Sequence, residues 1–152
     1  MQRRMTAPTK DEFLAAARRA FAYLHLYGFQ AEPAPEDARE VWLAFHGESV
    51  RVVVEGTNWG LNARVALGRA GPAAFENYDL EDLMALRGRG SLPKPPRGSL
   101  KMGTAQLQQV EFYAGVLRQV GEDILRGDLR SFPDLAARVE ERRRAFSRDQ
   151  PQ

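Results

Sequence analysis

The chain has 152 residues, of which 43% are hydrophobic and 28% are charged, and its formal net charge is +2. These values are ordinary for a globular protein, so we predict one domain over residues 1–152, with frayed ends at 1–8 and 147–152. The lack of cysteine excludes disulfides and thiolate chemistry, and with only two histidines we expect no metal site, no cofactor and no His-based catalytic group.

The first predicted element is a helix that begins after Thr9 and ends at Gly28. Thr9 and Glu12 have the spacing of a capping box, and apolar residues then recur at three- and four-residue steps. The second half of the helix is apolar nearly all round, because Tyr23 and Leu26 point away from the main stripe. This favours packing between the sheet and a neighbouring helix; the alternative is a homodimer contact through the first helix.

Three short runs with alternating apolar residues follow, separated by glycine-bearing turns. Alternation with a period of two is typical of strands with one buried face, and short connections predict an antiparallel meander. The predicted buried face, called the valine face below, consists of Val41, Leu43, Phe45, Val50, Val52, Val54, Ala63, Val65 and Leu67.

The opposite face of the meander is mixed in character. It carries Trp42, Arg51, Val53, Glu55, Arg64 and Ala66. Its charged residues can pair across strands, so this face is either a solvent-exposed surface with a tryptophan cover or a partner-binding surface. We favour the second interpretation for Trp42, with Arg51 and Arg64 as further contacts. Trp59, in the turn between two strands, is either an exposed interface anchor or an indole folded over the sheet edge.

Asp79 is placed to cap a short helix that ends at Gly88. Acidic residues gather around this cap: Glu76, Asp79, Glu81 and Asp82. Paired carboxylates can serve acid/base catalysis or hold magnesium, but capping and the helix dipole explain them here. We therefore predict no catalytic residue and no enzyme activity. We interpret His25 as a packing residue and His46 as a turn residue.

Residues 87–103 form a long segment rich in glycine and proline that contains no acid. Its length predicts a loop that is mobile or functional. Its five basic residues are Arg87, Arg89, Lys94, Arg97 and Lys101. They could follow phosphates, but no aromatic residue is interleaved to stack on bases, so we favour a solvated loop over a nucleic-acid site.

Two C-terminal helices are predicted after the loop. The first spans 104–127 and carries Gly121 in its buried stripe, where a missing side chain permits close backbone approach. Ser131 and Asp134 are placed to cap the second. The residues of this final helix that we expect to face inward are Leu135, Val139 and Phe146.

The segment DILRGDLRSFPDL, together with FENYDLEDLMALRG, resembles parts of small, mostly uncharacterised bacterial proteins, some of them grouped with immunity proteins of toxin systems. The resemblance covers roughly residues 10–146. It implies a leading helix, an antiparallel meander, a short helix and a helical end, and a role in binding a protein partner. The residues that carry it in detail are Tyr78, Asp79, Leu80, Gly127, Asp128 and Phe132.

Together these patterns predict an α+β fold: an N-terminal helix, a three-stranded antiparallel meander, a short helix, a long basic loop and two C-terminal helices packed on one sheet face. We expect a non-catalytic, immunity-like protein-binding module that covers the surface of a partner protein. The alternative is an accessory nucleic-acid-binding protein that uses residues 87–101. No apolar run reaches the ~18 residues of a membrane helix, and no secretory signal is visible, so we expect no membrane association and a cytoplasmic location.

Overall fold

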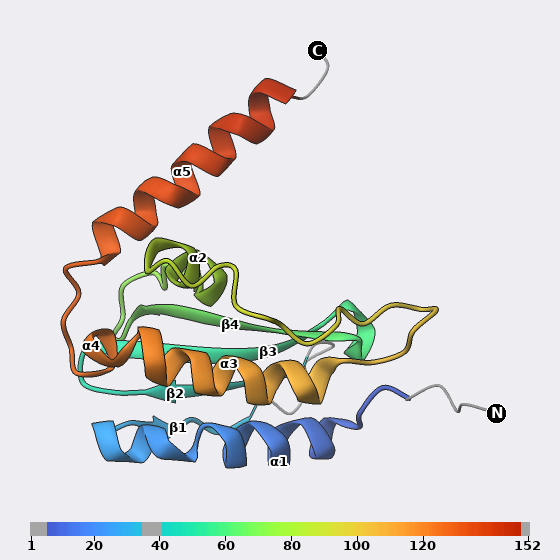
Figure 1. Cartoon of the computed structure of the whole chain (residues 1–152). Helices are drawn as coiled ribbons and strands as arrows, with labels where there is room; N and C mark the ends of the chain where they lie inside the picture. Colours follow the sequence, from blue (N-terminus) through green and yellow to red (C-terminus); the bar gives the residue numbers. More distant parts are fainter. Residues whose placement is uncertain (1–5, 35–40, 150–152) are drawn as a thin grey trace.

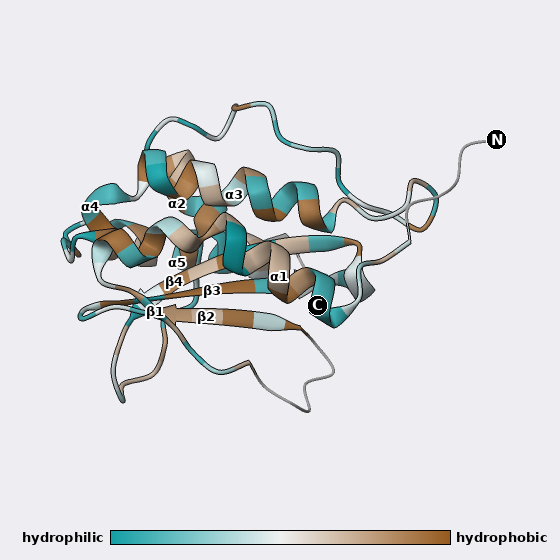
Figure 2. Cartoon of the chain, turned by 90° about the horizontal axis from the view of Figure 1, so that it is seen from below, coloured by the Kyte–Doolittle hydropathy of each residue, from teal (hydrophilic) through white to brown (hydrophobic). Residues whose placement is uncertain are grey.

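The structure is a computed structural model that describes residues 6–34 and 41–149. It is an α+β fold in which helices cover one face of a five-stranded antiparallel sheet of order β1-β2-β3-β4-β5 (Figures 1 and 2). The strands are β1 Gln30–Ala31, β2 Trp42–His46, β3 Val50–Thr57, β4 Asn62–Arg69 and β5 Tyr78–Asp79. The helices are α1 Lys10–Ala20, η1 Ala22–Tyr27, η2 Asn58–Gly60, α2 Leu80–Leu86, α3 Gln106–Val120, α4 Glu122–Leu125 and α5 Phe132–Asp149.

The predicted meander is confirmed as strands β2, β3 and β4. Leu43 pairs with Val54 across β2 and β3, and Val54 pairs with Val65 across β3 and β4, so the valine face is continuous. The prediction of three strands is incomplete, because β1 and β5 extend the sheet at its two edges. Each of these strands has only two residues, which is too short to show an alternating pattern.

The main hydrophobic core lies between the valine face and helices α1 and α3 (Figure 2). Residues Phe13 and Leu14 of α1 and Val110 and Leu117 of α3 are buried there. Every residue of the valine face belongs to this core, with Val41 half-buried at its margin. Burial of apolar surface between two layers is the main source of stability in such a fold.

The first predicted helix is present, but it changes geometry partway. Thr9 and Glu12 form the predicted capping box, with reciprocal contacts of 3.1 Å between the Thr9 nitrogen and Glu12 Oε1 and between the Glu12 nitrogen and Thr9 Oγ1. The α-helix ends at Ala20 and continues as the 3-10 helix η1, which ends at Gly28 in the left-handed conformation with φ 84°. Tyr23 packs inward and donates a hydrogen bond of 2.6 Å to the carbonyl oxygen of Ala114.

The helix predicted over 104–127 is divided in two at Gly121. A Cβ atom at this position would lie 2.8 Å from Leu117 Cδ1 and 3.5 Å from Leu83 Cδ2. The expectation of a close approach at Gly121 is therefore confirmed. The chain turns at this position, so α3 ends at Val120 and α4 begins at Glu122.

The final helix does not pack on the sheet as predicted. Helix α5 extends away from the body of the molecule (Figure 1), and Phe146 is 65% exposed instead of facing inward. Only its first turn is deeply anchored, by Phe132 and Leu135. The predicted cap is also wrong, because the hydroxyl of Ser131 is buried without a hydrogen-bond partner in the described part of the chain.

Helix α5 is fixed by a charged contact that sequence periodicity could not show. Both carboxylate oxygens of Asp82 in α2 accept hydrogen bonds from Arg142, at 2.8 and 2.9 Å. Asp82 is 4% exposed, so this pair and the nearby Arg138 compensate a buried charge. The ring of Phe132 also meets Tyr78 edge-on at 5.2 Å.

Candidate functional site

One end of the molecule is formed by the β3–β4 hairpin and the tip of the 87–103 loop (Figure 1). The amide of Leu61 donates to the carbonyl of Asn58 at 3.1 Å, which closes the hairpin turn with Trp59 and Gly60 at its centre. Both central residues have positive φ, 54° for Trp59 and 89° for Gly60, as in a type I′ turn. This turn favours Asn, Asp or Gly at its first central position, so a tryptophan there is strained.

Trp59 is also the most exposed of the large apolar residues in the described chain, at 93%. Its indole therefore gains almost nothing from packing within the molecule. An exposed tryptophan in a strained backbone conformation is not explained by folding stability. The sequence left open whether Trp59 is exposed or folded over the sheet edge; the structure shows it exposed.

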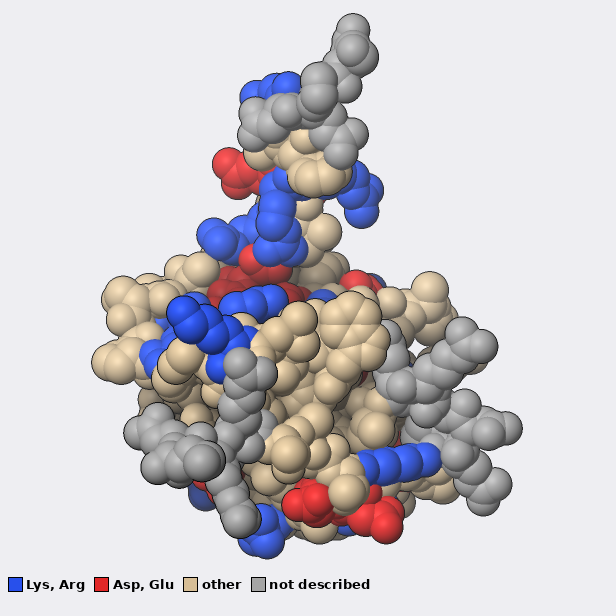
Figure 3. All heavy atoms as spheres, turned by 90° about the vertical axis from the view of Figure 1, so that its right-hand side faces the viewer, with Lys and Arg blue, Asp and Glu red and all other residues tan. Residues whose placement is uncertain are grey.

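The tip of the 87–103 loop lies beside this hairpin. Ser99 and Gly103 pair as an antiparallel bridge, so that Leu100 and Met102 project at 82% and 72% exposure. The base of this tip is bonded to the hairpin, because Thr104 donates to the Gly60 carbonyl at 2.6 Å. Figure 3 looks onto this end, where atoms of residues other than Lys, Arg, Asp and Glu fill the centre and charged residues of both signs lie around it.

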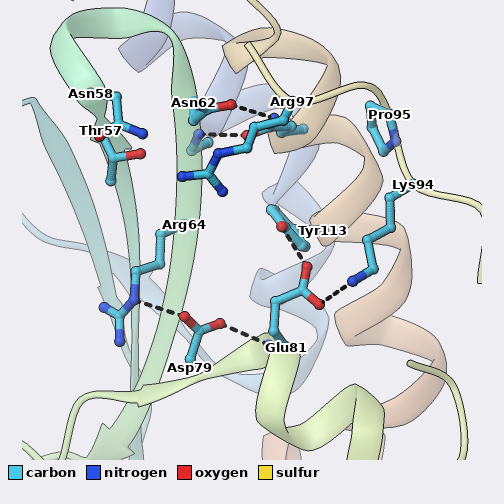
Figure 4. Close-up of a pocket in the computed structure, with 12 residues that line it drawn as sticks. Thr57, Asn58, Asn62, Arg64, Asp79, Glu81, Lys94, Pro95, Arg97 and Tyr113 are labelled. Atoms are coloured by element: carbon cyan, nitrogen blue, oxygen red, sulfur yellow. Dashed lines mark hydrogen bonds and ion pairs between the residues drawn. The ribbon is translucent and has the colours of Figure 1, made fainter. Parts of the chain in front are cut away.

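A cavity of about 550 Å³, called the β4 cleft below, opens next to the hairpin along the edge of β4 (Figure 4). Strand β5 pairs with β4 only at Ala66 and Leu67, which leaves the start of β4 free to form a wall. The opposite wall comes from the 87–103 loop and α3. The cleft is lined by Thr57, Asn58, Asn62, Ala63, Arg64, Asp79, Glu81, Lys94, Pro95, Arg97, Gln109 and Tyr113.

Buried amide side chains form the floor of the β4 cleft. Asn62 donates to the Gly98 carbonyl at 3.2 Å and accepts from the Gly98 amide at 2.8 Å, which ties the loop to β4. Gln109 of α3 donates to Asn62 Oδ1 and accepts from the Ala63 amide, both at 2.7 Å. Gln106 donates to the Asn62 carbonyl at 2.9 Å. These contacts supply hydrogen-bond partners to backbone groups of β4 that pair with no neighbouring strand, and they hold the walls of the cleft in place.

The two carboxylates of the cleft are already compensated. Arg64 donates to Asp79 at 3.0 Å, and the other oxygen of Asp79 accepts from the Glu81 amide at 2.8 Å as the predicted helix cap. Glu81 accepts hydrogen bonds of 2.7 Å from both Lys94 and Tyr113. Burial and the Glu81 hydrogen bond raise the pKa of Tyr113 above its ordinary value, so its hydroxyl stays a neutral donor.

The five basic residues of the loop have different surroundings. Arg87 pairs with Asp123 at 2.8 Å and Lys94 with Glu81 at 2.7 Å. Arg89, Arg97 and Lys101 are exposed, and none of the three makes an ion pair with another described residue. The loop is anchored at Gly98 and Lys94, while the mobility of residues 87–103 stays a prediction.

Trp42 and Arg51 lie apart from this end, on the face of the sheet opposite the helices. Trp42 packs against a small second cluster that contains Val53 and Ala66, as the pairing register predicted. Arg51 donates two hydrogen bonds to Glu32, at 2.8 and 3.1 Å, and its guanidinium lies 5.8 Å from the Trp42 ring centre. These interactions occupy both side chains within the molecule.

Arg64 lies between the outer face of the sheet and the β4 cleft. It forms the expected cross-strand pair with Glu55 at 3.5 Å, yet it also lines the β4 cleft. The predicted contact residues therefore do not form one surface. Arg64, Lys94 and Arg97 meet in the cleft, and Trp59 lies at the adjacent hairpin.

The lining residues that were not singled out from the sequence include Asn62, Gln109 and Tyr113. Asn62 follows a glycine turn and looks like a turn residue, and Tyr113 looked like part of an apolar helix stripe. The sequence offered one indication of the cleft: the polar residue Gln109 stands directly before the core residue Val110, at the margin of the buried helix stripe. Polar residues at the margin of a buried stripe indicate a hydrogen-bonded partner.

In the first helix Tyr23 is bonded to α3, whereas the large apolar side chain of Leu26 is 76% exposed; a homodimer contact through this helix stays a prediction. His25 is exposed, so its interpretation as a packing residue is wrong, and His46 lies 3.8 Å from Glu32 at a strand end. Within residues 6–34 and 41–149, no three His, Asp or Glu side chains converge as they would around a metal ion. None of the helices described is long and apolar enough to cross a membrane.

Compared with known family models, with curated proteins and with solved structures, the chain matches none of them. Its function must therefore be argued from the site itself.

Proposed function

We propose that the protein is a non-catalytic protein-binding module that contacts its partner with the end formed by the hairpin and the loop tip. The observation that carries this proposal is Trp59, which is 93% exposed and held in a left-handed conformation. Tryptophan is a preferred anchor of protein interfaces, where a rigid aromatic ring buries a large area. Burial of the indole against a partner offsets the free-energy cost of the backbone strain at this position.

The surroundings of Trp59 support the same proposal. Leu100 and Met102 add exposed apolar area on the neighbouring tip, and Lys101 between them adds a positive charge. Apolar residues with a charged rim are the usual composition of a protein interface. A second cavity of about 520 Å³ on the other side of the hairpin, which Trp59 helps to line, offers room for a partner side chain.

The resemblance to immunity proteins agrees with a role in covering a partner. Under this proposal the partner contacts are Trp59 and its neighbours. Trp42 and Arg51, which were expected from the sequence, are engaged inside the molecule instead. The cytoplasm is the compartment we propose.

Nucleic-acid binding through residues 87–101 is the second candidate. Arg89, Arg97 and Lys101 are the cations that favour it, since their side chains are exposed. Arg87 and Lys94 are engaged with acids, which reduces the charge available to phosphates. A gel-shift assay at two salt concentrations separates the two candidates, because phosphate contacts weaken steeply with salt.

The binding proposal is tested by affinity purification of the tagged protein from its native cells, with the recovered proteins quantified by mass spectrometry. We expect Trp59→Asn to lose a protein that the parent recovers. The matched control is Leu26→Asn, which removes an apolar side chain of similar exposure on another face. Equal recovery by the parent and both variants would refute the proposal.

A further inference from the structure

The charges lining the β4 cleft do not balance. Three cations, Arg64, Lys94 and Arg97, face two carboxylates, Asp79 and Glu81. Arg64 and Lys94 are each within 3.0 Å of one of these carboxylates, and Arg64 also pairs with Glu55 at 3.5 Å, so both cations are compensated. Arg97 remains as the one lining cation that has no ion pair with a described residue.

The side chain of Arg97 reaches across the mouth of the cleft instead of away from it (Figure 4). Its charge acts on the Tyr113 hydroxyl, whose pKa it lowers, although burial and Glu81 outweigh it and the net direction is upward. Asn58 and Thr57 line the same part of the cavity and can add neutral hydrogen bonds.

We propose that the β4 cleft binds a carboxylate group through the guanidinium of Arg97. A guanidinium presents paired N–H groups that match the two oxygens of a carboxylate. Asp79 and Glu81 are each already paired with a cation, so the single charge of Arg97 matches a monoanion better than a phosphate dianion. The cleft volume of about 550 Å³ leaves room for the body of the ligand beside Pro95 and the Tyr113 ring.

This carboxylate can belong to a free organic acid or to an acidic side chain or C-terminus of the partner protein. The inference does not depend on the proposed protein binding, because a free acid would use the same cleft. Two measurements distinguish the sources.

The first measurement is a titration of the full-length protein with benzoate, followed by NMR of the arginine side-chain N–H groups. We expect saturation at a dissociation constant of about 1–10 mM, the range for one charged contact in an open site. The neutral isostere benzamide should bind about tenfold more weakly or not at all. Arg97→Gln should remove benzoate binding, while Arg89→Gln, at an exposed arginine of the same loop outside the cleft, should leave it unchanged.

The second measurement is recovery of the protein partner by Arg97→Gln in the affinity purification described above. Loss of the partner with Arg97→Gln but not with Arg89→Gln supports a carboxylate of the partner, whether or not benzoate binds. If benzoate binding depends on Arg97, and Arg97→Gln recovers the partner as the parent does or neither recovers one, the result supports a free acid. No Arg97-dependent effect in either measurement overturns the inference, as does tighter binding of inorganic phosphate than of benzoate.

Discussion

Asn62 and Gln109 show how single buried amides can set the shape of a site. Asn62 is 3% exposed and Gln109 is 6% exposed, and together they join β4, the 87–103 loop and α3 through side-chain hydrogen bonds. A buried amide that loses its partner leaves an unsatisfied polar group, which costs more than the lost bond itself. The β4 cleft therefore depends on these two side chains although neither carries a charge.

We expect Gln109→Ala to lower the free energy of unfolding by about 2–3 kcal/mol, because the Ala63 amide and Asn62 Oδ1 each lose a buried hydrogen bond. The neighbouring Gln108 is exposed on the same helix, so Gln108→Ala should change stability by less than about 0.5 kcal/mol. Urea unfolding followed by circular dichroism measures both. Equal effects of the two substitutions would show that the amide network does not hold the cleft.

Glu32 and Arg51 give the outer sheet face a pH dependence. Hydrogen bonds from Arg51 lower the pKa of Glu32 from its ordinary value of 4.5. A lowered carboxyl pKa contributes stability that is complete above the ordinary value and is lost as the pH falls through the folded-state pKa. The stability difference between the parent and Glu32→Gln should thus be constant from neutral pH to about pH 5 and shrink below 4.5.

Urea unfolding at a series of pH values checks this expectation. Arg51→Gln removes the cause of the shift and should flatten the same acidic part of the profile. A difference between the parent and Glu32→Gln that stays constant down to pH values well below 4.5 would contradict the assignment of the Arg51–Glu32 pair.

At the scale of elements, the turn of the β3–β4 hairpin contains backbone strain at a non-glycine residue, which lowers the stability of the fold. Its turn has positive φ at Trp59 and Gly60, and the asparagine-glycine pair is the sequence this turn prefers. Gly60 also has no room for a side chain, because a Cβ there would lie 2.7 Å from the Cβ of Ala7. The turn is thus fixed in shape, and the tryptophan has to adopt it.

We expect Trp59→Asn to raise the free energy of unfolding by about 0.5–1 kcal/mol, because Asn adopts the left-handed conformation more readily. The indole is 93% exposed, so little packing is lost. Thermal unfolding of the parent and the variant provides the measurement. A clear loss of stability would mean that Trp59 serves the fold, and the argument for a binding role would lose its basis.

The elements also show which expectations a sequence can support. The valine face, the capping boundaries at Thr9 and Asp79 and the stop at Gly28 follow from local rules of periodicity and capping, and all are present. The predicted position of helix α5 was wrong, because the position depends on the contact between Asp82 and Arg142, which are 60 residues apart. Periodicity cannot show a pairing at that separation.

The same limit applies to the candidate site. Arg97 was recognisable as one of five basic residues in a segment without acids, and Trp59 as an aromatic in a turn, because both judgements need only neighbouring residues. The cleft was not recognisable, since it forms where β4, α2, the loop and α3 meet, and because Asn62 and Tyr113 have ordinary local explanations. Its polar floor forms only in the folded chain, from side chains of β4 and α3 and the backbone of the loop at Gly98.

At the scale of the whole molecule, two regions with different roles emerge. The sheet and helices α1 and α3 bury the valine face, and the outer face is closed by Trp42, Arg51 and Glu32. The end with Trp59, Leu100 and Met102 instead leaves apolar side chains exposed beside the β4 cleft. This division is the basis of the proposal that the hairpin end is where the protein meets its partner.

Site-specific photo-crosslinking in native cells tests this proposal most directly. A benzophenone amino acid is placed at position 100, which leaves Trp59 intact, or, as the control, at position 26, where an apolar residue is also exposed on a different face. The account predicts a defined protein adduct from position 100 and none from position 26. Equal labelling from both positions, or no adduct from position 100, would contradict it.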